Sequence, residues 1–386
     1  NLFAWPYSAS SFWSSDRYQT GFIAKLHPSV SLLTEIEKEE TLSKNPEVKK
    51  SIWDYSIDLI GPGERAQRQI ELARENDLQV YLKSEPELAF EAPGPPQIPC
   101  QDRWWDRANA LASAGTDGAW VFPFYQPFLG NTSGEIYKYA WWEPCEEKET
   151  LLDELAARIS GRQAGPSLRA AWKDVSASID DSPDMPPYYS GPYFLGPLHP
   201  LFADPQAERP KLYEHTTNLD PHFMMEPRGN VRAFAEFYRK MEESLRAAVE
   251  QLELADPLVP AGYQITYSAE AIPIRWFYHT VRTNANFYET HLLCRQLLDT
   301  SNERSKEANV ALLDRLHSVL LDEKENALQA IPLLDEDPRL EVCLHARLPS
   351  NKELMDTKMQ VLNDELNRFL PELRRRVLGD GPFILE

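Results

Sequence analysis

The first 130 residues alternate short apolar runs with stretches of helical spacing, and this alternation constrains the fold more than any other feature. The apolar runs cover residues 2–7, 30–36, 78–82 and 118–122. Helices are expected between them, over residues 16–26, 62–76 and 102–114. Runs that are apolar almost throughout are typical of parallel strands covered on both faces. The segment is therefore predicted to be an α/β fold with four adjacent parallel strands.

Four strands are too few for a closed eight-stranded barrel, and half a barrel leaves two unpaired edges. Two interpretations remain open. The chain contains the second half of a (β/α)8, TIM-like barrel whose first half lies upstream in a longer protein, or it forms a small open α/β sheet. The barrel half is preferred because the first strand begins at Leu2, which suggests processing or a cut from a longer chain.

The rest of the chain has a different pattern. Residues 143–228 hold helical pieces and a stretch rich in Pro, Gly and Tyr. From residue 231 onward, apolar residues recur at steps of three and four, as in 231–249 and 310–327. This spacing predicts antiparallel helices that bury their apolar stripes against one another. The expected organisation is a barrel half over 1–142, a connecting region over 143–228 and an all-α C-terminal domain over 229–386.

Composition excludes several classes of function. The formal net charge of −20 argues against nucleic acid as a partner, because phosphate binding needs a basic surface. There is no run of about 18 apolar residues, so no membrane-spanning helix is expected. The four cysteines are isolated from one another, which argues against a structural zinc site or a disulfide framework. No metal or cofactor is predicted, and the cellular compartment stays undetermined.

Candidate site residues follow from the geometry of parallel barrels, whose reactive groups lie at the C-terminal ends of the strands. That rule selects Trp5 and Tyr7, Glu35 and Glu37, Lys83 and Glu91, and Tyr125. Aromatic rings beside carboxylates suit a sugar, because pyranose rings stack on flat apolar faces and glycosidic cleavage uses two carboxyl groups. Glu37 is the first candidate for an acidic catalytic residue, followed by Glu91 and Glu35. The aromatic residues and Lys83 would bind the substrate.

Each of these candidates also has a plainer interpretation. Glu37 begins an acidic run that ends at Glu40, and such a run is often a solvated charged surface. Lys83 either binds a polar substituent of the substrate or neutralises Glu37 across the barrel. The adjacent tryptophans 104/105 and 141/142 are expected to place one ring of each pair in the core and the other partly at the surface. Trp104 is the candidate for a stacking role.

Several short motifs resemble a poorly characterised group of bacterial glycoside-hydrolase-like barrel proteins. In the first part of the chain they are Trp5-x-Tyr7-Ser8, Val30…Ile36-Glu37, Asp54-Tyr-Ser…Gly61-Pro62, Val80-Tyr-x-Lys83, Glu91…Pro95…Ile98-Pro99 and Gly115-x-Asp117-Gly118. Residues 273–279 (PIRWFYH) and 325–340 are similar to the helical extension of the same group. The resemblance covers most of the chain, although each motif is short. After the fourth apolar run the chain departs from the group, because Pro123 and Gln126-Pro127 replace a stretch with Trp and Gly.

The resemblance implies a barrel whose earlier strands precede Asn1, and carbohydrate hydrolysis akin to that of the hexosaminidase-like barrels. In that wider class the catalytic acidic pair commonly follows the fourth strand, which would lie upstream of this chain. The preferred hypothesis is a glycoside-hydrolase-like protein that hydrolyses a glycosidic bond by carboxylate acid/base chemistry. The alternative is a non-catalytic carbohydrate-binding or scaffold protein with a degenerate barrel. A helical interaction module with an α/β appendage ranks third.

Overall fold

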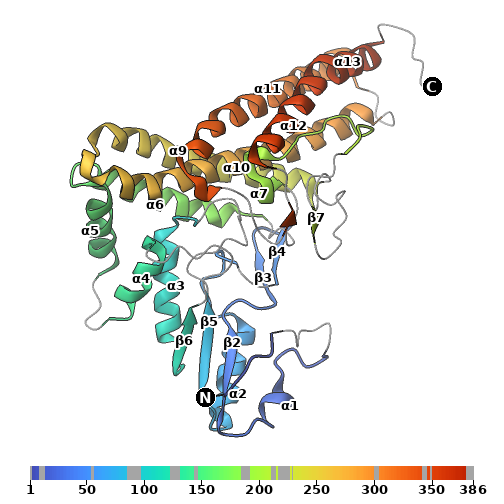
Figure 1. Ribbon diagram of the computed structural model, residues 1–386. Coiled ribbons are helices and arrows are strands. Elements are labelled where there is room, and N and C mark those ends of the chain that lie inside the picture. Colours follow the sequence, from blue (N-terminus) through green and yellow to red (C-terminus); the bar gives the residue numbers. More distant parts are fainter. Residues whose placement is uncertain are drawn as a thin grey trace. The chain divides into compact units, whose positions relative to one another are not determined.

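The computed structural model describes residues 2–7, 14–53, 56–84, 97–121, 131–142, 147–183, 192–209, 214–215, 227, 229–299, 304–340, 346–347 and 350–379. The chain divides into two compact units, drawn in one ribbon in Figure 1. Unit 1 comprises residues 1–92, 96–185 and 244–274, and unit 2 comprises 93–95, 186–243 and 275–386. The division does not follow chain order, because helices α9 (Val231–Ala255) and α10 (Gln264–Leu298) each contribute to both units.

Unit 1 contains the predicted parallel sheet. Its strands are β1 (Leu2–Ala4), β2 (Val30–Glu35), β5 (Val80–Ser84) and β6 (Gly118–Val121). They lie in the order β1-β2-β5-β6, and each pairs in parallel with its neighbour. The prediction of four adjacent parallel strands is therefore confirmed, with ends that differ by a few residues. A small parallel sheet of this kind fits part of a (β/α) barrel.

The helices predicted between the strands are present, with one shortened. Helix α2 (Glu64–Glu75) and helix α3 (Gln101–Ser113) match the prediction closely. The helix expected over residues 16–26 is reduced to the single turn α1 (Thr20–Ile23). Gln19 has a left-handed backbone, with φ at 59°, and a residue in that conformation cannot continue a right-handed helix.

An antiparallel hairpin that the sequence analysis did not predict follows β2. It pairs β3 (Glu40–Ser43) with β4 (Lys49–Ile52). Gly61 follows this hairpin and has a left-handed backbone, with φ at +81°. A Cβ added to Gly61 would lie only 2.5 Å from Cγ1 of Ile36. Only glycine fits both the backbone angle and the space at this position.

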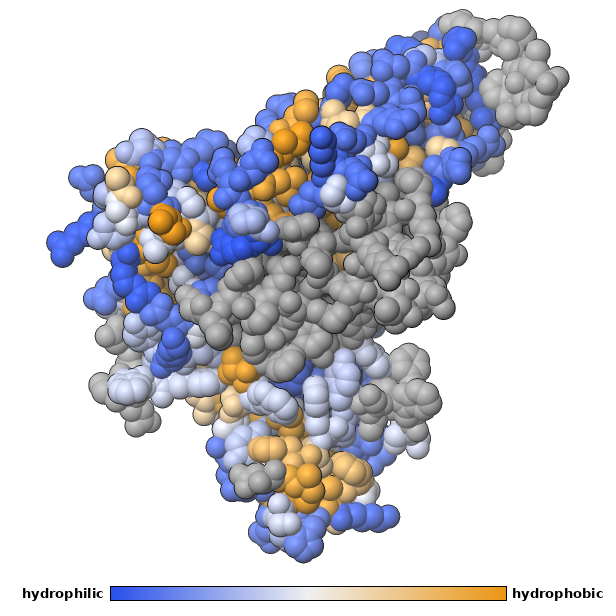
Figure 2. Space-filling view, viewed as in Figure 1, coloured by the Kyte–Doolittle hydropathy of each residue, from blue (hydrophilic) through white to orange (hydrophobic). Residues whose placement is uncertain are grey.

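The two faces of the sheet have different neighbours. Helix α2 packs on β2 and β5, and Thr34 hydrogen-bonds to Gln69 of that helix. Side chains alternate between the two faces along a strand. Thr34 faces α2, so Leu33 and Glu35 lie on the opposite face, together with their register partners on the neighbouring strands. The register assigns Tyr81, Lys83, Trp120 and Phe3 to that second face. Phe3 and Trp120 are half-exposed there, and Figure 2 shows hydrophobic residues gathered over this part of unit 1.

The remainder of unit 1 is helical. It contains α4 (Thr132–Ala140), α5 (Lys148–Ser160), α6 (Gly165–Ser178) and the 244–274 portion of α9 and α10. Glu270 of α10 is buried and accepts hydrogen bonds from Thr132 Oγ1 at 2.6 Å, Gln97 Nε2 at 2.9 Å and Gln101 Nε2 at 3.2 Å. Burial raises the pKa of Glu270. These hydrogen bonds tie α10 to α3 and α4, since a buried carboxyl group is costly without donors.

Unit 2 is mostly helical, and the helices predicted from residue 231 onward are present. Besides its portions of α9 and α10, it holds α7 (Pro192–Leu195), α11 (Lys306–Glu336), α12 (Asn351–Asp364) and α13 (Leu370–Leu378). A π-helical segment, Glu365–Phe369, joins α12 to α13, and β7 (Glu214–His215) pairs with β8 (Ala346–Arg347). The side-chain pairs Arg282–Asp322 and Asn326–His279 run in opposite chain directions, as antiparallel α10 and α11 require. In the described part of the chain, no helix is both long and apolar enough to cross a membrane.

Candidate functional site at the strand ends

Aromatic rings gather where β1 ends. The Trp5 ring lies 5.0 Å from the Tyr7 ring and 5.9 Å from the Trp120 ring, between centroids. Trp5 is 39% exposed and Trp120 is 42% exposed, so both indoles offer surface to a ligand. Half-exposed, mutually packed aromatic rings form a rigid apolar platform.

A buried ion pair adjoins this platform. Glu35 and Lys83 are register partners on β2 and β5, and Lys83 Nζ lies 3.4 Å from Glu35 Oε1. Lys83 Nζ also lies 5.6 Å from the centre of the Trp5 ring. Both charged side chains are almost fully buried, at 1% and 2% exposed. The sheet register thus brings Trp5, Lys83 and Glu35 together at neighbouring strand ends.

Glu37 lies two residues past Glu35, but its partner differs from the one expected. Its carboxylate forms a buried ion pair with Arg107 of α3, whose Nη1 also donates to the Ser56 carbonyl at 2.7 Å. The expectation that Lys83 neutralises Glu37 is corrected, because Lys83 pairs with Glu35. Glu37 is fully buried, so the interpretation of this position as part of a solvated acidic run is also wrong.

A lysine lies between the Tyr7 ring and one further ring, that of Trp53. Lys38 Nζ is 4.3 Å from the centre of the Tyr7 ring and 4.4 Å from that of Trp53, and Lys38 is buried. A desolvated ammonium held between aromatic faces gains from both quadrupoles. This contact fixes Tyr7 next to Trp5. Burial also lowers the pKa of the Arg65 guanidinium, whose Nε lies 3.7 Å from Oε2 of Glu39.

The arrangement combines two chemical capacities. Trp5, Tyr7 and Trp120 can stack on an apolar ring face, while Glu35 and Lys83 lie close behind them. An opposite charge stabilises the ionised form of a carboxylate. The carboxylates of Glu35 and Glu37 could therefore take part in binding hydroxyls or in stabilising positive charge, if substrate reaches them.

The other predicted residues have different outcomes. Glu91 and Tyr125 lie outside the described residues. Trp104 is 1% exposed and its Nε1 donates to the Ile98 carbonyl at 3.0 Å, so the prediction of a substrate-stacking role is corrected: this ring is part of the core. The expectation of one buried and one exposed ring also fails for both tryptophan pairs. Trp105 is buried like Trp104, whereas Trp141 and Trp142 are both exposed.

Sequence reasoning missed four residues of this site: Trp120, Arg107, Lys38 and Trp53. Only Trp120 carried a usable signal, because counting alternate positions along β6 puts it on the face of Lys83. The contacts of the other three depend on the hairpin and on the packing of α3, neither of which a strand pattern specifies.

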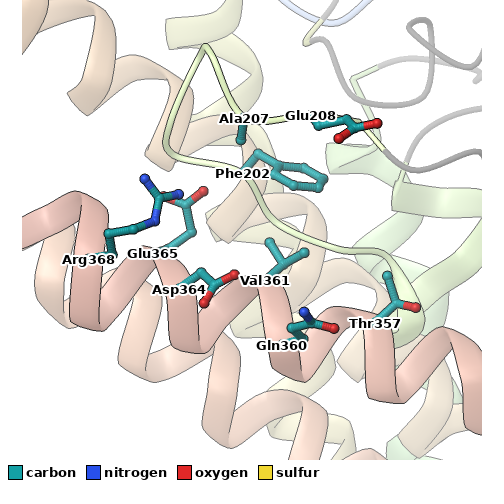
Figure 3. A pocket seen from close by; sticks show the side chains of 9 residues that line it. All are labelled: Phe202, Ala207, Glu208, Thr357, Gln360, Val361, Asp364, Glu365 and Arg368. Carbon is teal, nitrogen blue, oxygen red and sulfur yellow. The ribbon is translucent and has the colours of Figure 1, made fainter. Parts of the chain in front are cut away.

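Unit 2 contains a separate pocket of about 400 Å³ that no predicted residue lines (Figure 3). Its lining comprises Phe202, Ala207, Glu208, Thr357, Gln360, Val361, Asp364, Glu365 and Arg368. Glu365 is buried and accepts a hydrogen bond from the Asp204 backbone N–H at 3.1 Å. Burial raises the pKa of Glu365 to about 7. A carboxyl group that titrates near neutral pH is therefore present in the helical unit.

Comparisons with known proteins agree with the architecture at a coarse level. No protein-family model matches the chain, and no curated protein matches its sequence. Among solved structures, the chain is similar to a GH138 enzyme targeting pectin rhamnogalacturonan II, with a TM-score of 0.50 and 11% identity. The match covers 92% of this chain but 44% of that enzyme, so the chain spans less than half of its length. The similarity shows a shared fold: a mixed α/β unit and a largely helical C-terminal half, as in part of a glycoside hydrolase.

Proposed function

We propose that the chain belongs to a carbohydrate-active protein, and that the strand ends of unit 1 bind and cleave a glycosidic substrate. The observation that carries the proposal is the position of the half-exposed Trp5 ring, which packs against Trp120 and lies 5.6 Å from Nζ of Lys83 in the buried Glu35–Lys83 pair. Pyranose recognition needs an apolar platform beside groups that bind hydroxyls, and both are present within one edge of a parallel sheet. The fold shared with part of the GH138 enzyme supports the same class of substrate.

In this proposal Glu37 remains the first catalytic candidate. Paired with Arg107, it would stabilise positive charge on the sugar or act as a base, with Glu35 as the second carboxylate. Glu91 and an acidic pair upstream of Asn1 are the further candidates for the proton donor. Tyr7 and Tyr125 would complete the platform, and Lys83 would bind a polar substituent.

The proposal includes a barrel completed by further β/α units upstream of this chain, related to the hexosaminidase-like barrels. Phe3, Trp5 and Trp120 on the second face of the sheet support this part, because such rings are commonly covered in a closed barrel. The alternative function is a non-catalytic carbohydrate-binding protein. It is favoured by the ion-pairing of both carboxylates, because a paired carboxylate can serve binding alone.

The Glu37→Gln variant tests the enzyme against the binding protein. The full-length protein, including any segment that precedes Asn1, is incubated with rhamnogalacturonan II and with oligosaccharides derived from pectin, and new reducing ends are measured. We expect Glu37→Gln to lower turnover at least tenfold, equivalent to about 1.4 kcal/mol of transition-state stabilisation. Glu64→Gln, which removes an exposed carboxylate from α2, serves as the charge-matched control and should keep full turnover.

Three results contradict or redirect the proposal. Equal turnover in Glu37→Gln and the wild type would assign this residue a structural role. Retention of the sugars without hydrolysis, abolished by Trp5→Ala, would favour the binding protein. Neither binding nor hydrolysis of any substrate would reject both functions.

A further inference from the structure

The second exposed tryptophan cluster of unit 1 lies at the opposite end of the strands, beside the start of β6. Trp141 is 38% exposed and Trp142 is 74% exposed, at the C-terminal end of α4. They line a pocket of about 320 Å³ that also includes Thr116, Asp117 and Gly118. The strand-end site lies where the strands finish, so this pocket is a separate place on the same sheet. Leu111, Ala112, Ala119 and Ala140 complete its lining.

One of the two indoles is held rigidly. Trp141 Nε1 donates to the Ala108 carbonyl at 2.9 Å, and its ring meets the Tyr137 ring edge-on at 5.4 Å. The indole therefore satisfies its polar atom within the protein and still leaves part of its surface open. The protein already fixes the rotamer of this ring. A ligand that stacks on it therefore binds without the entropy cost of immobilising a mobile side chain.

The lining of the pocket also supplies polar atoms. Asp117 accepts hydrogen bonds from Val80 N–H at 2.8 Å and from Arg74 Nη1 at 2.9 Å, both through Oδ2. These contacts leave Oδ1 to accept a hydroxyl. Thr116 Oγ1 donates to the Gly118 carbonyl at 3.2 Å and keeps its own acceptor capacity. Gly118 contributes no side chain, so the backbone of β6 borders the pocket directly.

Charge selects between classes of ligand. Among the lining residues that the structure describes, Asp117 carries the one formal charge, and Arg74 pairs with it. This described lining has no net charge and gives no advantage to an acidic or basic ligand. Apolar faces with hydroxyls at the edge describe an uncharged pyranose, which pairs its ring face with an indole and its hydroxyls with carboxylate and hydroxyl oxygens. A purely apolar partner surface would leave Asp117 Oδ1 and the acceptor capacity of Thr116 Oγ1 unpaired.

We propose that the Trp141–Trp142 pocket is an auxiliary binding site for an uncharged sugar unit of a polysaccharide. The site holds the polymer and takes no part in bond cleavage. This proposal rests on the lining of the pocket alone and is independent of hydrolysis at the strand ends.

Affinity electrophoresis of the whole chain tests this site. The gels contain dextran, galactomannan, xyloglucan or pectin, and a gel without polymer gives the reference mobility. We expect at least one uncharged polymer to retard the wild type. Trp142→Ala should weaken that retardation on the order of three- to tenfold in apparent Kd, and Trp142→Phe should keep part of it. Because Trp142 is mostly exposed, its removal leaves the core intact, which circular dichroism checks.

The control is Ile265→Ala, which removes an apolar side chain that is 87% exposed elsewhere in unit 1. It should migrate like the wild type in every gel. The proposal is overturned if no uncharged polymer retards the wild type, if Trp142→Ala is retarded equally, or if Ile265→Ala loses retardation as well. Retardation that depends on Trp142 in a chain without hydrolytic activity supports this site and rejects only the enzymatic function proposed above.

Discussion

Buried ion pairs occur in both units, but in different surroundings. In unit 2, Glu323 and Lys358 form an ion pair, and both are fully buried. Thr283 and Asn286 donate hydrogen bonds to the Glu323 carboxylate. Lys358 Nζ also donates to the Pro197 carbonyl at 2.7 Å. In unit 1, the Glu35–Lys83 pair lies next to the half-exposed ring of Trp5. A buried charge alone therefore does not mark a functional site. What distinguishes the strand ends is the contact between buried charge and accessible aromatic surface.

The largest effect is expected from removing one member of the enclosed pair. Lys358→Met leaves the Glu323 carboxylate buried without its cation, which costs about 3–5 kcal/mol in unfolding free energy. Urea unfolding measures this loss. The double variant Lys358→Met/Glu323→Gln removes both charges and should recover most of it.

Lys83→Met is the matching change at the strand ends. We expect it to cost less than Lys358→Met, because Glu35 lies beside exposed rings and can relax toward water. If Lys83→Met and Lys358→Met lower the free energy of unfolding equally, the comparison fails. The Glu35–Lys83 pair would then be as enclosed as a pair in the protein core.

The pocket of unit 2 allows a second test of buried charge, through pH. Burial raises the pKa of Glu365 from 4.5 to about 7, so the folded protein holds this proton more tightly than the unfolded chain. The stability that the protonated group contributes is fully present below pH 4.5 and is lost as the pH rises to about 7. Above that pH the ionised carboxylate costs about 3 kcal/mol.

Glu365→Gln should therefore stabilise the protein by about 3 kcal/mol at about pH 8 and by less than about 1 kcal/mol at about pH 5. Gln keeps an acceptor for the Asp204 N–H, so the comparison isolates the charge. Urea unfolding at the two pH values measures the difference. Glu208→Gln, which removes an exposed carboxylate from the same pocket, should not reproduce this pH dependence. A gain that is the same at both pH values would show that the ionisation of Glu365 is not responsible.

The strands were predictable from sequence because apolar runs of about five residues, separated by amphipathic helices, allow few other arrangements. The β3–β4 hairpin was not, because Thr41, Lys50 and Ser51 interrupt the apolar alternation that normally marks a strand. The site was predictable only as far as strand ends determine it. Trp5, Lys83 and Glu35 meet because of the sheet register, whereas Arg107 reaches Glu37 from a position 70 residues later on a helix.

The tryptophan pairs show why burial is harder to predict than fold. Neighbouring residues on a helix point about 100° apart, so one buried and one exposed ring is the reasonable expectation. Helix α3, however, packs on β6, α4, α5 and α6, and it buries both Trp104 and Trp105. Trp141 and Trp142 end a helix and extend beyond its packed part. Local spacing does not specify how many sides of a helix are covered.

The smallest effect on the free energy of unfolding is expected from Trp120→Ala at the strand ends. Trp104→Ala, which removes a core ring, is the variant against which it is compared. Removing the core ring of Trp104 should cost about 3–5 kcal/mol, because it leaves a cavity and the Ile98 carbonyl without its donor. Removing Trp120, which is 42% exposed, should cost about 1 kcal/mol or less. Its loss should instead weaken sugar binding at the strand ends about three- to tenfold, because Trp5 loses the ring packed against it. Urea unfolding and titration with a short pectin oligosaccharide separate the two effects. If Trp120→Ala unfolds as easily as Trp104→Ala and binds sugar normally, the exposed rings serve stability, and the aromatic platform is no longer evidence for a binding site.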